Sequence, residues 1–140
     1  MKVSNIMSTQ LVCISHEASL KDAHDLMKNR GVRHLPVISE SNGTLVGILT
    51  HKKMISTVMS IIYKYGADAL EKKERHQGIQ TLMESDFQRL NKDEPLTIVA
   101  EYFIDNKLGC LPVVDAKGKI EGIVTSSDFV KLCAELLKSQ

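Results

Sequence analysis

The chain has 140 residues, of which 43% are hydrophobic and 25% charged, a composition that fits one compact globular domain and excludes a disordered chain. Its 18 basic and 17 acidic residues give a formal net charge of +1, which argues against a broad nucleic-acid surface. The longest apolar runs, such as residues 58–63, fall far short of the roughly 20 residues of a membrane-spanning helix, and residues 1–4 lack a secretory apolar core. We therefore expect a cytoplasmic protein with neither a membrane nor a nucleic acid as partner.

The first part of the chain predicts the element order β-α-β-β-α. Strands are expected at residues 11–14, 35–38 and 45–49, with a hairpin turn at residues 41–43. The first helix is expected to begin after Ser19, which Asp22 can help to cap, and to end at Gly31. Thr50 is expected to cap the second helix.

Residues 52–65 predict a long helix, because apolar side chains recur there at helical spacing. These side chains are Ile55, Val58, Met59 and Ile62. Gly66 interrupts the pattern, and the charged run at residues 71–75 predicts a solvated connector. The apolar stripe of the helix could also serve a partner chain.

The rest of the chain predicts the same order again. Strands are expected at residues 87–90, 111–114 and 120–124, with a turn at residues 117–118. Pro95 is placed to occupy the first position of a helix that carries Leu96, Val99 and Phe103 on one face. A closing helix is expected at residues 128–137.

Short motifs recur at a nearly constant offset. Leu-Pro-Val occurs at residues 35–37 and again 76 residues later, and Gly-Ile-Leu-Thr at residues 47–50 returns 75 residues later as Gly-Ile-Val-Thr. Ile-Met at residues 6–7 matches Leu-Met at 82–83, again 76 residues apart. Three landmarks in the same order indicate an internal duplication.

The duplication predicts the domain organisation. We expect a first repeat at residues 1–55, a helical and charged connector at residues 56–79, and a second repeat with a C-terminal helix at residues 80–140. A unit of about 50 residues is too small to cover its apolar sheet face alone. The expected fold is therefore mixed α/β (α+β), with two β-α-β-β-α repeats packed about a pseudo-twofold axis.

The three cysteines do not form a metal-binding pattern. Cys13, Cys110 and Cys133 are an odd number, lack CxxC spacing and lie in apolar runs. We expect buried, reduced thiols rather than disulfides or a metal site.

The second copy of the Gly-Ile-[Leu/Val]-Thr motif continues as Thr125-Ser126-Ser127-Asp128, where a strand is expected to lead into a helix. Thr125 can act as an N-cap, and Asp128 can accept a hydrogen bond from the Thr125 N–H as in a capping box. A fresh helix start also suits a phosphate, and a carboxylate beside it suits two ribose hydroxyls. The pattern allows a structural cap and a ligand site alike.

With both copies aligned, the sequence resembles the cystathionine-beta-synthase (CBS) domain family in its tandem-pair form. The resemblance runs from about residue 3 to residue 132 and rests on the two Leu-Pro-Val motifs and the two Gly-Ile-[Leu/Val]-Thr motifs. It implies a regulatory or sensing module that binds an adenosine-containing ligand between the repeats, such as AMP, ADP, ATP or S-adenosylmethionine. Such a ligand is regulatory, and no cofactor is implied.

The resemblance also implies a site. Carried over to this chain, the ribose and phosphate would be held by the end of the last strand and the start of the last helix, and the opposite wall would come from the first repeat. The residues so implied are Ile123, Thr125, Ser127 and Asp128 on one side and Val12, Val32, Arg33 and His34 on the other.

The other cleft departs from the family pattern. Lys53 occupies the place that Asp128 has in the second copy, and an ammonium group cannot accept hydrogen bonds from ribose. The resemblance places Thr50 beside it and Gln88, Leu108, Gly109 and Cys110 on the opposite wall. We expect this cleft to be vacant or adapted to a more anionic ligand.

An enzyme is not expected. The five histidines, at positions 16, 24, 34, 51 and 76, show no ligand spacing, and no serine or cysteine lies in a nucleophile signature. The rival hypothesis is a ligand-free interaction module, because CBS pairs commonly form flat homodimers through their helices. A regulated partner protein would read either the ligand or the dimer.

Overall fold

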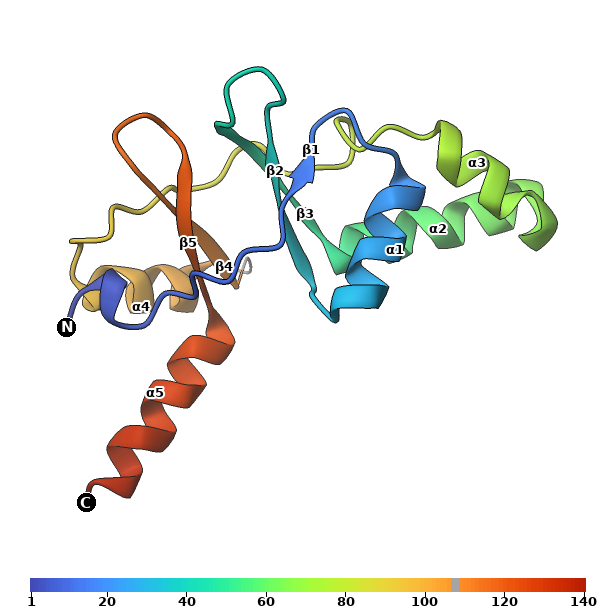
Figure 1. Cartoon of the computed structure of the whole chain (residues 1–140). Coiled ribbons are helices and arrows are strands. Elements are labelled where there is room, and N and C mark those ends of the chain that lie inside the picture. Colours follow the sequence, from blue (N-terminus) through green and yellow to red (C-terminus); the bar gives the residue numbers. More distant parts are fainter. Residues whose placement is uncertain (107–108) are drawn as a thin grey trace. The chain divides into compact units, whose positions relative to one another are not determined.

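The computed structural model describes residues 1–106 and 109–140 and divides the chain into two compact units (Figure 1). The first unit is Val12–Asp86, and the second unit joins Met1–Leu11 to Phe87–Gln140. The N-terminal segment thus belongs to the same compact unit as the second set of repeated motifs. Our division of the sequence into repeats at residues 1–55 and 80–140 stays a prediction about the sequence.

The first unit follows the predicted order with one additional helix, although its first strand is Ile14–Ser15 and not residues 11–14. Its elements are β1 (Ile14–Ser15), α1 (Leu20–Arg30), β2 (His34–Ile38), β3 (Leu45–Thr50), α2 (His51–Tyr65) and α3 (Leu70–His76). The Ser19 N–H donates to the Asp22 carboxylate at 3.0 Å, and the Asp22 N–H donates to the Ser19 hydroxyl at 3.2 Å, so the predicted capping box opens α1. Gly31 ends α1 in the left-handed region, with φ of 63°.

The sheet of the first unit has the strand order β1-β2-β3. β1 runs parallel to β2, and β2 pairs antiparallel with β3. Leu35, Val37 and Leu49 of this sheet pack with Leu20 of α1 and Met54 of α2 in one core of buried side chains. Both helices are amphipathic, and their apolar faces cover the sheet.

The sequence predicts a solvated connector at residues 71–75, but part of this charged run is buried. It lies in α3, where the Glu74 side chain is only 3% exposed and its Oε2 lies 2.8 Å from Nδ1 of His24 on α1. A buried carboxylate needs a hydrogen-bond partner, and His24 supplies it. The pairing spans 50 residues of sequence, so helical periodicity in α3 alone gave no sign of it.

The second unit contains a shorter sheet. Its elements are a 3₁₀ turn (Val3–Asn5), α4 (Leu96–Asp105), β4 (Cys110–Val114), β5 (Ile120–Thr125) and α5 (Ser126–Lys138). β4 and β5 form an antiparallel pair. Leu111 and Val124 of the sheet pack against Val99 of α4 and against Val3 in a second buried core.

Two sequence-based expectations for the second unit are corrected. Residues 87–90 form no strand, because Leu90 alone among them bridges to β4, at Val113. This bridge corresponds to the pairing of Ile14 in β1 with Val37 in β2 of the first unit. Pro95 is the N-cap of α4 rather than its first helical residue. The missing strand leaves a single ladder position at the place where the first unit has β1.

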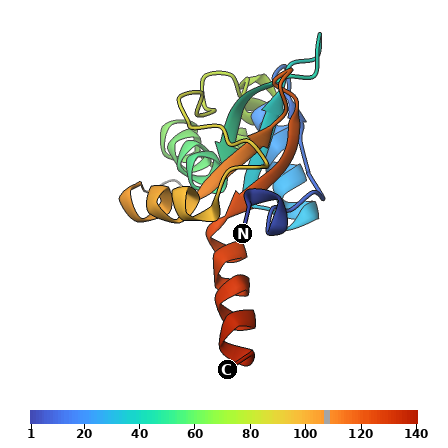
Figure 2. The same ribbon diagram turned by 90° about the vertical axis from the view of Figure 1, so that its left-hand side faces the viewer.

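α5 leaves the end of β5 and extends away from the β4–β5 sheet (Figures 1 and 2). Only its first turns pack: the ring of Phe129 lies 5.7 Å from that of Phe103, centroid to centroid, in an edge-to-face arrangement. Val130, Leu136 and Leu137 of α5 are exposed. Cys133 is also exposed, which corrects the expectation that all three cysteines are buried; Cys13 is half-buried and Cys110 fully buried, and all three are free thiols.

A methionine crosses the last strand of each unit at its glycine. In the first unit Ile48 and Glu84 exchange two backbone hydrogen bonds of 2.9 and 2.7 Å, which lays Met83 over Gly47. In the second unit Ser8 and Ile123 exchange bonds of 2.8 and 3.0 Å, and Met7 lies over Gly122. The Ile-Met and Leu-Met motifs found in the sequence are therefore the segments that dock on the repeated glycine motif.

Candidate functional site

The junction between β5 and α5 brings three predicted site residues together. The Thr125 N–H donates to Oδ2 of Asp128 at 2.7 Å, and the Thr125 hydroxyl donates to the same oxygen at 3.3 Å. The Ser127 hydroxyl lies 3.0 Å from the Thr125 hydroxyl. Asp128 thus reaches back to the start of the helix as the sequence predicted, and its carboxylate is held in place beside two hydroxyl groups.

The junction between β3 and α2 has the same backbone and different side chains. The Thr50 hydroxyl accepts a hydrogen bond of 3.1 Å from the Lys53 N–H, so Thr50 is the predicted N-cap. At each junction the N–H of the first helical residue donates to the carbonyl of the residue that precedes the paired strand. The His51 N–H donates to the Arg33 carbonyl at 2.8 Å, and the Ser126 N–H donates to the Gly109 carbonyl at 3.1 Å. The two helix starts are therefore anchored alike, and only the second has a carboxylate.

The residue opposite each threonine in the paired strand is ionisable and at least half-buried. His34 pairs with Thr50, and Cys110 pairs with Thr125. Burial, followed by the charge of Arg33, lowers the pKa of His34, and burial, followed by the charge of Asp128, raises the pKa of Cys110 to about 12. Burial therefore favours the neutral form of each side chain.

The two sides of the predicted adenosine site lie in different units. Ile123, Thr125, Ser127 and Asp128 belong to the second unit, where they surround the β5–α5 junction. Val12, Val32, Arg33 and His34 belong to the first unit, where Val12 and Val32 pack against its core. The meeting of these two sets of residues across the units stays a prediction.

The predicted second cleft also draws on both units. Thr50 and Lys53 open α2 in the first unit, whereas Gln88, Gly109 and Cys110 lie in the second. Gln88 is exposed on the segment that precedes α4, and Leu108 lies outside the described residues. Lys53 stands at the third position of α2, as Asp128 does in α5.

A cavity of about 360 Å³ in the first unit was not foreseen from the sequence. It is lined by His24, Met27 and Lys28 of α1, by residues 31–33, and by His51, Met54 and Ile55 of α2. We call it the α1–α2 cavity. His24 and Lys28 are spaced by four residues and so share one face of α1, which is the only signal in the sequence that could have suggested it.

Neither a cluster of metal ligands nor a membrane-spanning helix is found in the part of the chain that the structure describes. There, no three histidine, cysteine or acidic side chains come together as ligands for a metal ion. Over residues 1–106 and 109–140, no helix combines the length and the apolar character needed to cross a bilayer.

The comparison with protein families decides the family. The CBS domain model matches residues 3–60 and residues 79–135. The chain belongs to the CBS domain family. It carries two CBS domains in tandem, which confirms the fold class and the internal duplication inferred from the repeated motifs.

Solved structures of CBS pairs resemble this chain over nearly its whole length. CBSX2 of Arabidopsis thaliana, solved in complex with AMP, is 27% identical, with a TM-score of 0.79 over 96% of this chain and 97% of that one. The CBS domain pair of protein MJ0100, solved with 5′-methylthioadenosine and S-adenosyl-L-methionine, is also 27% identical, with a TM-score of 0.75 over 96% and 97% of the two chains.

Some curated relatives are longer than this chain. An uncharacterized protein of Methanocaldococcus jannaschii, MJ1225, is 29% identical over 133 residues, which cover 94% of this chain and 47% of MJ1225. A homoserine O-acetyltransferase of Methanococcoides burtonii is 30% identical over 130 residues, which cover 93% of this chain and 24% of the transferase. The match to the transferase thus involves about a quarter of that protein.

Proposed function

We propose that this CBS pair is a regulatory module that binds an adenosine-containing ligand of the AMP, ADP, ATP or S-adenosylmethionine class between its repeats. The observation that supports this most is the β5–α5 junction, where Thr125, Ser127 and Asp128 surround a helix start. The AMP complex of CBSX2 and the S-adenosylmethionine complex of the MJ0100 pair support the choice of ligand class.

The chemistry of the junction suits a ribose. Both hydrogen bonds from Thr125 use Oδ2 of Asp128, and a carboxylate has about four acceptor positions in all, so Oδ1 has the capacity to accept from vicinal ribose hydroxyls. The Ser127 hydroxyl, and the Thr125 hydroxyl once it turns away from Asp128, can donate to a phosphate at the positive end of α5. Ile123, half-buried before the junction, would lie under the sugar.

The first unit would supply the other wall. Val12 and Val32 offer apolar surface to the adenine, and the exposed Arg33 guanidinium can bind a phosphate through two parallel N–H groups. His34 is partly buried and follows Arg33 directly, so a phosphate held by Arg33 would also favour a proton on His34. In this proposal one repeat provides the carboxylate and the other the cations.

The second cleft is proposed to be vacant or to hold a more anionic ligand. Lys53 offers an ammonium where Asp128 offers acceptors, and Gln88, Leu108, Gly109 and Cys110 would form the far wall. We further propose a cytoplasmic, non-catalytic module that acts as a homodimer and transmits ligand binding to a partner protein.

A ligand-free interaction module is the second candidate, and α5 is the observation that favours it. Val130, Leu136 and Leu137 are 68%, 55% and 70% exposed, so this helix offers apolar surface that the second unit does not cover. In that case the clefts would stay empty, and the helices alone would mediate dimerisation.

Isothermal titration of AMP and of S-adenosylmethionine into the purified protein separates the two candidates. We expect at least one of them to bind, and Asp128→Ala to weaken binding by about 100-fold, because each hydrogen bond to a charged acceptor contributes about 1.5–3 kcal/mol. A ligand at 100 times its Kd should also stabilise the fold by about 2.7 kcal/mol in thermal unfolding.

Asp22→Ala is the matched control. It removes the acidic residue from the capping box at the start of α1, and so removes a comparable helix cap without touching the proposed site. Equal affinities of the Asp22→Ala and Asp128→Ala variants would contradict the site. Unchanged unfolding temperature with both ligands at millimolar concentration would contradict adenosine binding and favour the interaction module.

A further inference from the structure

The α1–α2 cavity lies wholly within the first unit, between the last turns of α1 and the first turns of α2. Its volume of about 360 Å³ falls in the range of small-molecule sites. We propose that it binds an organic phosphate, that is, a phosphoryl group carried on a small apolar body. This goes beyond the proposed adenosine site, with which the cavity shares only Val32 and Arg33.

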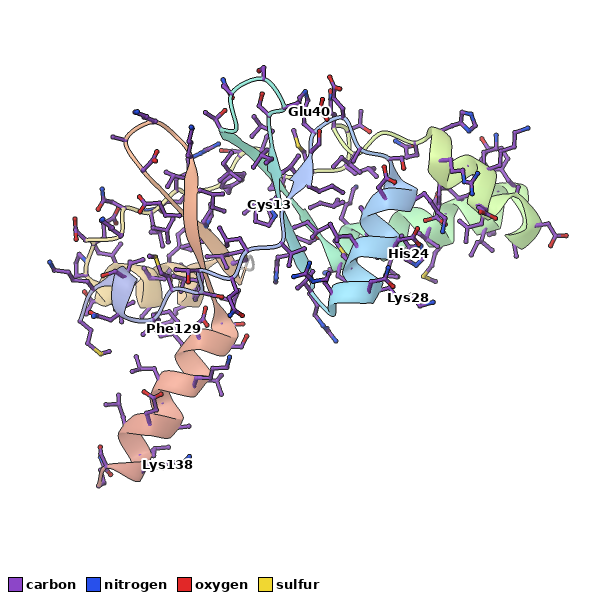
Figure 3. The ribbon with its side chains drawn as sticks, viewed as in Figure 1. Cys13, His24, Lys28, Glu40, Phe129 and Lys138 are labelled. Carbon is purple, nitrogen blue, oxygen red and sulfur yellow. The ribbon has the colours of Figure 1, made fainter. Side chains whose placement is uncertain are left out.

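The charged side chains that line the cavity have one sign. Lys28 and Arg33 carry cationic side chains, His24 and His51 add ring nitrogens, and no acidic residue is among the described residues that line the cavity. His24 and Lys28 come from successive turns of α1 (Figure 3). A phosphate monoester carries a charge of about −1.5 to −2 near neutral pH, which two fixed cations match.

The position of His24 is fixed by a buried partner. Oε2 of Glu74 lies 2.8 Å from its Nδ1, and the Glu74 side chain is 3% exposed while that of His24 is 31% exposed. A carboxylate accepts, so Nδ1 carries the hydrogen of this bond, and Nε2 can donate to a phosphate oxygen when the ring carries both protons. The pairing holds the imidazole in one orientation at the wall of the cavity.

Of the two helix ends at the cavity, the start of α2 favours an anion. α2 is 15 residues long and begins at His51, so the positive end of its dipole lies at the lining. The opposite, negative end of α1 is weakened, because the N–H groups of Gly31 and Val32 both donate to the Met27 carbonyl. The start of α2 adds to the side-chain charges and does not replace them.

The remaining lining is apolar, which is why the proposal names an organic phosphate and not the inorganic ion. Met27 and Met54 are buried to 3% and 1% exposure, and Val32 and Ile55 pack against the same core. Methionine side chains adapt to irregular and aromatic ligand surfaces. A charged rim above an apolar floor is the arrangement that fits a phosphoryl group on an apolar body.

The methionines allow a direct test on the full chain. With methionine methyl groups labelled with ¹³C, phenyl phosphate is titrated in while methyl spectra are recorded. We expect saturable shifts of the Met27 and Met54 signals and none of Met7, which lies in the other unit. Lys28→Gln should weaken binding by about tenfold, because a charge-assisted hydrogen bond to phosphate is lost.

Controls separate this site from the adenosine site and from nonspecific charge effects. Arg30→Gln removes an exposed cation of α1 that does not line the cavity and should leave binding unchanged. Asp128→Ala should also leave it unchanged, whether or not the adenosine proposal holds. Phenol, which lacks the phosphoryl group, should bind at least tenfold more weakly. Absence of saturable shifts, equal shifts of Met7, or equal affinity of Lys28→Gln and the parent would overturn the proposal.

Discussion

Thr50 and Thr125 stand at equivalent helix starts, and the two sites differ in the side chain three positions after the threonine. At Thr50 the hydroxyl alone caps α2, and the third helical residue is Lys53. At Thr125 the third residue is Asp128, whose carboxylate accepts from both the N–H and the hydroxyl of the threonine. Since α2 starts without a carboxylate, the strand-to-helix turn of this fold does not require one.

That comparison separates structure from function at the second junction. A lysine at the start of a helix is unfavourable for the dipole, whereas an aspartate there is favourable. The first unit nevertheless carries the lysine and forms a 15-residue helix. The fold therefore does not require Asp128 at this position, and the proposed contact with ribose would explain its presence.

The largest effect is expected where the two units are alike, at the glycines beneath the crossing methionines. A Cβ on Gly122 would lie 2.7 Å from Sδ of Met7 and 3.1 Å from the Ser8 carbonyl oxygen, and one on Gly47 would lie 2.5 Å from Sδ of Met83 and 3.2 Å from the Glu84 oxygen. Gly47→Ala and Gly122→Ala should each lower the free energy of unfolding by about 1–3 kcal/mol, as overpacking does. Urea denaturation measures the loss.

Gly78→Ala provides the control, because nothing lies within 4 Å of a Cβ there. Adding Met7→Ala to Gly122→Ala should recover part of the loss, since it removes the closest atoms while the backbone contact with Ser8 stays. If Gly78→Ala costs as much as the other two, steric crowding by the crossing segments is not the cause.

A smaller effect is expected where the two units differ, at the third residue of each helix. Asp128→Ala should lower the free energy of unfolding without ligand by about 1 kcal/mol, the usual contribution of a helix cap. Lys53→Ala should leave it unchanged or raise it slightly, because it removes a cation from the positive end of α2. Both are measured by urea denaturation of the ligand-free protein. Equal losses for the two variants would mean that the carboxylate has no special part in the second junction.

The local features of the fold could be predicted because each has a cause within a few residues. The Ser19–Asp22 box, the left-handed Gly31 and the Thr50 cap all follow from side chains three or four positions apart or from a single glycine. The duplication supplied the rest, because a motif found twice in register is more informative than either copy. The same reasoning placed Asp128 against Thr125 correctly.

The features that the sequence did not reveal depend on distant contacts. Residues 87–90 have the composition of a strand, yet only Leu90 finds a partner in β4. Glu74 lies in a run of charges, and only its approach to His24 from another helix explains its burial. The α1–α2 cavity likewise combines side chains that precede β2 in the sequence with side chains that follow β3, and no local pattern brings these together.

The smallest effect is expected at His34, whose counterpart opposite the second threonine is Cys110. Burial and the Arg33 charge lower the pKa of His34 below its ordinary value of 6.5, so the unfolded chain takes up a proton at a higher pH than the folded chain does. The stability that His34 contributes is therefore fully present above about pH 6.5 and is lost as the pH falls through that value toward the lower pKa of the folded state.

His34→Gln should flatten this part of the stability profile, measured by urea denaturation between about pH 8 and pH 5. His76→Gln, at an exposed histidine of α3, is the matched control for the removal of an imidazole. If the stability profile of His34→Gln is as steep as that of the parent, the burial of His34 does not oppose its protonation. The comparison with Cys110, which burial keeps neutral at the same place in the other unit, would then be wrong.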